Sequence, residues 1–187
     1  MYKRQDLLTA TRTRTAWTRF TPHGASPNAL AAMLLAWADQ PDDARAALQA
    51  EESRLTELGH DRPRTLMLFT RSELECRAGR WDDALLHAEN GLRTAELTGD
   101  AFYGALVRYA RGLVLAQRGQ LDEARADAEH VIAEGQAPVA VRFGAALLGF
   151  VELSLGDHEA VDRHLGSWAA ALPASGAYDP GLSLIHI

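Results

Sequence analysis

The sequence predicts an all-α protein: a right-handed α-solenoid of about four antiparallel helix hairpins with a period of about 40 residues. The composition favours helices, because the 187 residues include 34 Ala and 27 Leu but only 7 Val and 3 Ile, and β-branched residues favour strands. One short segment recurs at nearly constant spacing, and Pro, Gly, Ser or Asp interrupts the sequence between its copies. These observations predict helix hairpins that stack on one another.

The recurring segment begins with a turn residue, at Asp39, Gly79, Gly119 and Gly156, with offsets of 40, 40 and 37 residues. Glycine ends a helix well because it adopts the left-handed backbone conformation without steric cost. Acidic residues follow in the first turn of the next helix, where the helix dipole favours negative charge. Each copy therefore predicts a tight turn between two antiparallel helices.

Small side chains stand at two fixed distances from each turn residue. Seven residues before it lie Ala32, Ser72, Gly112 and Gly149. Five residues after it lie Ala44, Ala84, Ala124 and Val161. Small residues at these places allow the two helices of a hairpin to approach closely.

The first two hairpins are delimited by capping residues and prolines. Ser26 supplies a helix cap and Pro27 suits the first helical turn, while Pro63 marks the start of the second hairpin. The predicted helices of these hairpins span residues 27–38, 41–58, 63–78 and 81–98.

The last two hairpins begin at Asp100 and at Pro138. Their predicted helices span residues 100–118, 121–134, 138–155 and 158–172. Leu106, Tyr109 and Leu113 recur at the helical period and form an apolar stripe. A single hairpin cannot bury such a stripe alone, so stacking of successive hairpins is expected.

Both ends of the chain are expected to derive from a sequencing adapter. Residues 182–187 can be back-translated into DNA whose reverse complement encodes residues 1–5, when GTG is taken as the start codon. This inverted pair resembles a transposon-end adapter, so residues 1–5 and 182–187 are excluded from fold reasoning. We expect a partial helix and loop at 6–26 and repeats at 27–181, within a fragment of a longer protein.

Net charge and hydropathy exclude several classes of function. The formal charge is -6, and without residues 1–5 and 182–187 it is -8, from 17 basic and 25 acidic residues. Such a chain lacks the basic surface that nucleic-acid binding requires, so no direct contact with nucleic acid is expected. No apolar run approaches about 20 residues, so no membrane span is expected. The single cysteine, Cys76, fits a reducing compartment, and a cytoplasmic location is expected.

The residues that carry chemistry do not assemble into a recognisable catalytic or metal site. His87 and Glu89 form a His-x-Glu as in zinc deaminases, but no Cys pair follows. His158 and His164 are six residues apart and therefore point to different faces of a helix. A lone Cys76 on an Ala- and Leu-rich helix is typical of a core residue. No phosphate-binding Gly-x-x-x-x-Gly-Lys is present. No catalytic residue, metal or cofactor is therefore expected, and the chain is predicted not to be an enzyme.

Acidic residues in the predicted helices have ordinary structural interpretations. The pairs Asp42-Asp43, Asp82-Asp83 and Asp122-Glu123 recur at helix starts, which favours a dipole role over acid-base catalysis. Glu73 and Glu75 each lie four residues from an arginine, Arg77 or Arg71, and are expected to form surface pairs on their own helix.

The order of small residue, Gly, bulky residue, acids and Ala resembles the tetratricopeptide repeat, although that family has a shorter period of about 34 residues. The stretches 72–84 (SELECRAGRWDDA), 119–126 (GQLDEARA), 149–157 (GFVELSLGD) and 179–181 (DPG) resemble, more specifically, the helical region of large ATP-binding LuxR-family (MalT-like) transcriptional regulators. The resemblance covers residues 29–181. It implies a non-catalytic sensing and interaction segment that follows an ATPase module, precedes a helix-turn-helix domain and transmits self-association in the parent protein.

The same resemblance implies a concave groove lined by the first helix of each hairpin. Six residues would project into it: Leu66, Phe69, Tyr109, Leu113, Phe143 and Phe150. They would hold a protein or peptide partner, or a small apolar inducer. The alternative is that neighbouring repeats bury these side chains as core. For the whole chain, the alternative function is an independent tetratricopeptide-like adaptor, and a helical enzyme would require a polar pocket with convergent titratable groups.

Overall fold

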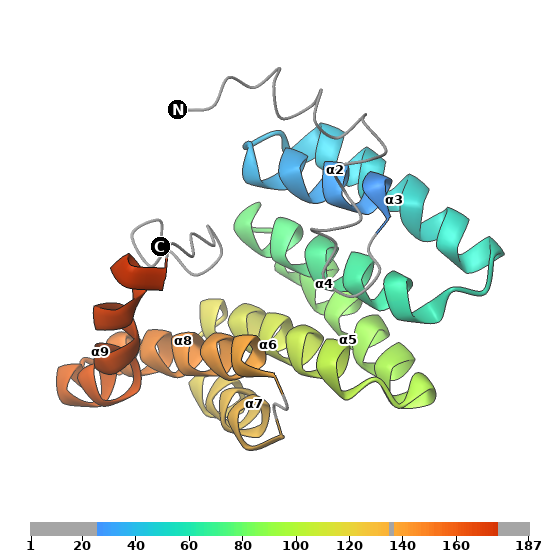
Figure 1. Ribbon diagram of the computed structural model, residues 1–187. Coiled ribbons are helices and arrows are strands. Elements are labelled where there is room, and N and C mark those ends of the chain that lie inside the picture. The colour runs from blue at the N-terminus through green and yellow to red at the C-terminus, as the bar shows by residue number, and fades with distance from the viewer. Residues whose placement is uncertain (1–25, 135–136, 176–187) are drawn as a thin grey trace.

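The computed structural model describes residues 26–134 and 137–175, and this part of the chain is all-helical (Figure 1). Its helices are α2 (Pro27–Trp37), α3 (Pro41–Glu57), α4 (Asp61–Arg77), α5 (Trp81–Thr98), α6 (Ala101–Gln117), α7 (Leu121–Glu134), α8 (Pro138–Leu155) and α9 (His158–Ser175). The all-α prediction is confirmed. The partial helix expected before Ser26 and the adapter-derived ends lie outside the described residues.

The helix bounds differ little from those predicted from the sequence. Helix α4 begins at Asp61, two residues before Pro63, because a proline in the first turn of a helix has no hydrogen bond to lose. Helix α9 continues to Ser175, beyond the predicted end at residue 172. The other described helices begin and end within one or two residues of their predicted bounds.

The predicted turn residues have the left-handed backbone conformation in all four hairpins. The φ angle is 72° at Gly79, 77° at Gly119 and 78° at Gly156, and Asp39 is the non-glycine example at 56°. In each turn the next backbone N–H donates to a carbonyl five residues earlier, as Arg80 does to Glu75 at 2.9 Å. Such a bond satisfies a carbonyl that the end of a helix would otherwise leave unpaired.

The small residues before and after each turn lie where paired helices meet. Ala44, Ala84 and Ala124 are fully buried. A Cβ added at Gly112 would lie 2.4 Å from Leu147 Cδ2 and 3.5 Å from the Ala124 carbonyl oxygen, so a larger residue here would force Leu147 to shift. The fourth hairpin departs from the pattern, because Val161 is half-buried and its neighbour Ala160 is buried instead.

The helices pack in the order of the chain, from the blue α2–α3 pair to the red α9 in Figure 1. Each helix contacts the next one. In addition, the first helices of successive hairpins contact one another, as α4 does with α6 and α6 with α8. The resulting core contains Leu48, Met67, Val107, Leu147 and Val151, all fully buried.

Two ion pairs join successive helix pairs at the same distances from the left-handed turns. Arg45 of α3 binds Glu75 of α4 through two hydrogen bonds of 2.7 and 3.0 Å. Arg125 of α7 binds Glu152 of α8 in the same two-point manner. The residues at the same distances from Gly79 and Gly119 are the apolar Leu85 and Leu115.

The surface pairs expected for Glu75 and Arg71 on one helix are not formed. The Glu75 side chain is buried and binds Arg45, with Arg80 at 3.3 Å, whereas Arg71 pairs with Glu52 of α3. Packing of α3 against α4 is the reason, because it supplies partners from outside α4 and removes Glu75 from water.

One position differs between α8 and the earlier first helices of the helix pairs. The residue three positions before each left-handed turn is buried in the first three pairs, as Ala36, Cys76 and Ala116, whereas Leu153 in α8 is 51% exposed. Cys76 packs with Ala84 and with Val114 of the following hairpin. Leu153 has no following hairpin among the described residues, so its side chain faces solvent.

Helix α8 is the one described helix whose length and apolar composition would suffice to cross a membrane. Half of that stretch is buried inside the protein, and Phe143, Leu147 and Val151 are among its buried residues. A helix buried in a protein core can be as long and as apolar as a membrane-spanning helix, so the composition of α8 is weak support for a membrane span.

Candidate functional site

The six residues of the predicted groove lie, as expected, on the first helices of their hairpins. Leu66 and Phe69 belong to α4, Tyr109 and Leu113 to α6, and Phe143 and Phe150 to α8. Because α4 contacts α6 and α6 contacts α8, side chains that are up to 84 residues apart in sequence belong to one layer of helices.

Three aromatic rings of this set meet in the core. The ring centroids of Tyr109 and Phe143 are 4.7 Å apart, those of Phe69 and Phe143 are 6.2 Å apart, and those of Phe69 and Tyr109 are 6.5 Å apart. These are favourable distances for tilted and edge-to-face aromatic pairs. The three side chains are 3–6% exposed. Their burial favours the core interpretation for this cluster.

The remaining three groove residues differ in exposure. Leu66 is also buried, whereas Leu113 and Phe150 are half-buried and pack against the core from its edge. Binding by these residues stays a prediction.

The acidic pairs lie at helix starts, as predicted. Asp42 and Asp43 are in the first turn of α3, Asp82 and Asp83 in that of α5, and Asp122 and Glu123 in that of α7. Arg80 binds Asp83 at 2.7 Å and lowers the pKa of that carboxyl. These carboxylates therefore have the dipole and ion-pair roles of helix N-termini.

Cys76 is enclosed by protein, and burial raises the pKa of its thiol to about 12. Its thiolate, which is the nucleophilic form, is scarce at neutral pH. This environment is that of a structural cysteine.

The histidines that the sequence singled out lie apart. His87 of α5 is half-buried, and burial lowers its pKa, with the nearby Arg71 charge acting in the same direction. His158 is exposed and His164 half-buried, both on α9. Within residues 26–134 and 137–175 no three His, Cys, Asp or Glu side chains are grouped closely enough to hold a metal ion.

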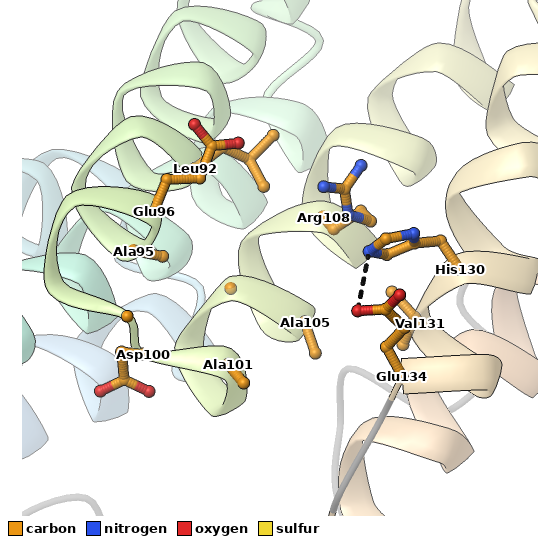
Figure 2. Close-up of a pocket in the computed structure, with 12 residues that line it drawn as sticks. Leu92, Ala95, Glu96, Asp100, Ala101, Ala105, Arg108, His130, Val131 and Glu134 are labelled. Atoms are coloured by element: carbon orange, nitrogen blue, oxygen red, sulfur yellow. Dashed lines mark ion pairs between the residues drawn. The ribbon is translucent and has the colours of Figure 1, made fainter.

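A pocket of about 260 Å³ opens between α5, α6 and α7 (Figure 2). Its floor is made of small residues, Ala101, Gly104 and Ala105 from α6 with Ala95 from α5. Leu92 and Glu96 stand on the α5 side, and Arg108, His130 and Glu134 on the other. Sequence reasoning missed this site. The available signal was Gly104, because the residue 40 positions earlier is Arg64, which has a much larger side chain.

The charged groups of the pocket are only partly neutralised by protein partners. Arg108 donates one hydrogen bond of 3.4 Å to Asp127, which Arg111 already binds at 2.5 and 2.8 Å. His130 Nε2 lies 3.9 Å from a Glu134 carboxylate oxygen. The pocket thus combines small apolar residues with the guanidinium of Arg108 and the carboxylates of Glu96, Asp100 and Glu134.

Comparisons of the chain with protein-family models, with curated proteins and with solved structures gave no match in any of the three.

Proposed function

We propose that this chain is a non-catalytic sensing and protein-interaction scaffold, built as a right-handed, tetratricopeptide-like solenoid of four helix hairpins. The observation that carries this proposal is the recurrence of turn and packing features at corresponding positions. The left-handed turn, the buried small residues and the bidentate Arg45–Glu75 and Arg125–Glu152 pairs return at corresponding positions. Repeats of this kind present extended surfaces for partners.

The parent of this scaffold is, in our proposal, an ATP-dependent LuxR-type transcriptional regulator of the cytoplasm. The support is the resemblance of residues 72–84, 119–126 and 149–157 to the helical region of those regulators. In such a parent the repeats bind a protein or peptide, or a small apolar inducer, and take part in self-association. ATP hydrolysis and DNA binding belong to the other modules of the parent.

The genomic DNA on both sides of codons 6 and 181 tests this parentage directly. Outward PCR from the source DNA, followed by sequencing, is expected to find a phosphate-binding loop upstream and a helix-turn-helix domain downstream. Stop codons close to either end, or unrelated flanking domains, would reject the regulator and leave an independent adaptor.

A mobility-shift assay tests the separation of roles within the parent. At a net charge of -6 this chain is expected to leave duplex DNA unshifted even at low salt, because it cannot release many counterions from phosphates. A shift that disappears as salt is added would contradict the proposal.

A further inference from the structure

We propose that the pocket between α5, α6 and α7 binds a small zwitterion of the amino-acid class, with its carboxylate on Arg108. This inference goes beyond the proposed function, because it uses neither the aromatic cluster nor the flanking modules. The pocket lies over the first half of α6, whereas the ring cluster of Phe69, Tyr109 and Phe143 belongs to the core.

The space exists because the third hairpin lacks a side chain that the second one has. Gly104 of α6 stands 40 residues after Arg64 of α4. The Arg64 guanidinium reaches back to within 3.7 Å of Glu52 on α3. The residue 40 positions after Glu52 is Leu92, which lines the pocket. The Arg64–Glu52 ion pair of one helix pair thus corresponds to open space between Gly104 and Leu92.

Arg108 supplies the group that would bind a carboxylate. Its side chain is 23% exposed, and its one hydrogen bond within the described residues is the long contact of 3.4 Å to Asp127. Asp127 is already satisfied by two shorter bonds from Arg111. A guanidinium has five N–H donors in a planar fork that matches a carboxylate, so Arg108 retains donors for a ligand.

The opposite charges around the pocket favour a zwitterion over a simple anion. Glu96 on α5 lies across the pocket from Arg108, and Asp100 and Glu134 also line the pocket (Figure 2). Asp100 is already paired with Arg62 at 2.5 Å. Carboxylates repel a phosphate or a polyanion, but they attract an ammonium group. A ligand with a carboxylate and an ammonium group meets a group of opposite charge for each of them in this pocket.

The small apolar residues of the pocket floor indicate which side chain the amino-acid ligand carries. Ala95, Ala101, Gly104 and Ala105 offer apolar surface without polar side chains, and Leu92 and Val131 flank it. The volume of about 260 Å³ is slightly below that of ordinary drug-sized sites. An aliphatic side chain of three to four carbons, as in leucine or valine, suits these dimensions.

Titration of the purified chain with L-leucine, followed by NMR chemical shifts or calorimetry, tests the proposal. 4-Methylpentanoate carries the carboxylate of leucine without the ammonium group, and isoamylamine carries the ammonium group without the carboxylate, so both serve as matched probes. We expect saturable leucine binding in the micromolar to millimolar range, and binding at least tenfold weaker for each single-charge probe. Absence of leucine binding at millimolar concentration would overturn the proposal, and equal binding of 4-methylpentanoate would overturn the assignment of a zwitterion.

Three variants locate the binding. Arg108→Gln removes the carboxylate partner while Arg111 keeps Asp127 paired, and it is expected to weaken leucine binding at least tenfold. Gly104→Leu fills the floor and should abolish binding, whereas Gly104→Ala adds a Cβ that meets only Ala95, at 3.5 Å, and should retain it. Circular dichroism checks the fold of each variant. Leucine binding that is unchanged in folded Arg108→Gln and Gly104→Leu proteins would place the ligand elsewhere and reject this site.

Discussion

The guanidinium of Arg45 on α3 holds the buried carboxylate of Glu75 on α4 through two hydrogen bonds of 2.7 and 3.0 Å. This contact joins two hairpins across 30 residues of sequence. The residues at the corresponding distances from the next two turns are Leu85 and Leu115. Apolar side chains therefore stand at the positions that correspond to this ion pair.

The first prediction concerns replacement of the Arg45–Glu75 ion pair by apolar residues. Arg45→Ala is expected to lower the free energy of unfolding by about 2–4 kcal/mol, because it leaves Glu75 buried with only Arg80 beside it. The double variant Arg45→Leu with Glu75→Leu should lie within about 1 kcal/mol of the original protein, since two apolar side chains replace the pair. Urea unfolding measures both. As a control, Asp42→Ala removes an exposed partner of Arg45 and should change stability by less than about 0.5 kcal/mol. A double variant as unstable as Arg45→Ala would contradict the prediction.

The second prediction compares two glycines of α6. Gly104→Ala is expected to stabilise the protein by about 0.5–1 kcal/mol, because alanine is the better helix former and the new Cβ has room. Gly112→Ala should destabilise it by about 1–2 kcal/mol, since its Cβ would lie 2.4 Å from Leu147 and 3.1 Å from Asp127 in a closely packed core. The midpoints of chemical denaturation give the comparison, and effects of equal sign would be inconsistent with the packing described.

The third prediction concerns acid. Glu51 of α3 is buried and accepts hydrogen bonds from Arg54, Ser26 and Asn28, and these bonds, that from Arg54 foremost, lower its pKa from 4.5. A lowered pKa in the folded state contributes stability that is present above pH 4.5 and is lost as the pH falls through the folded value. Glu51→Gln should therefore flatten the loss of stability below pH 4.5. Glu57→Gln, at the exposed end of the same helix, is the control. It should leave the loss of stability below pH 4.5 as it is in the original protein.

The fourth prediction concerns thiol reactivity. With a pKa of about 12, the Cys76 thiolate amounts to about one molecule in ten thousand at pH 8. Alkylation by iodoacetamide should be very slow in the native protein and should accelerate in urea along the unfolding transition. Rapid alkylation under native conditions, without unfolding, would show a reactive cysteine and reopen the enzymatic alternative.

The fifth prediction uses the exposed end of the stack. Leu153→Gln is expected to change the free energy of unfolding by less than about 0.5 kcal/mol, because the side chain is already half in water. Leu147→Ala, at a fully buried position on the same helix, should cost about 2–5 kcal/mol. Thermal and urea unfolding compare the stability of the two variants. A large loss of stability for Leu153→Gln would show that another part of the chain or a second copy covers Leu153.

The helices and turns were predictable because their rules act over a few residues. A glycine at Gly79 and acids at the next helix start determine local backbone geometry, and both lie where the sequence predicted them. The partner of Glu75 was not predictable, because Arg45 reaches it only after α3 packs on α4. The pocket was missed for a related reason: it arises from a side chain that Gly104 lacks, and the missing volume has meaning only between helices already stacked. The six residues of the predicted groove lie on the first helices of their helix pairs, as predicted. Their burial depends on how closely α4, α6 and α8 approach one another.

The extensive packing of each helix involves helices no more than two places away along the chain. Contacts that are local in sequence close short loops, which costs little chain entropy and favours rapid folding. They also allow the two ends to open without disturbing the middle. Amide hydrogens of α2 and α9 should consequently exchange with solvent sooner than those of α5 and α6, so that the gradient of protection runs outward from the centre of the chain.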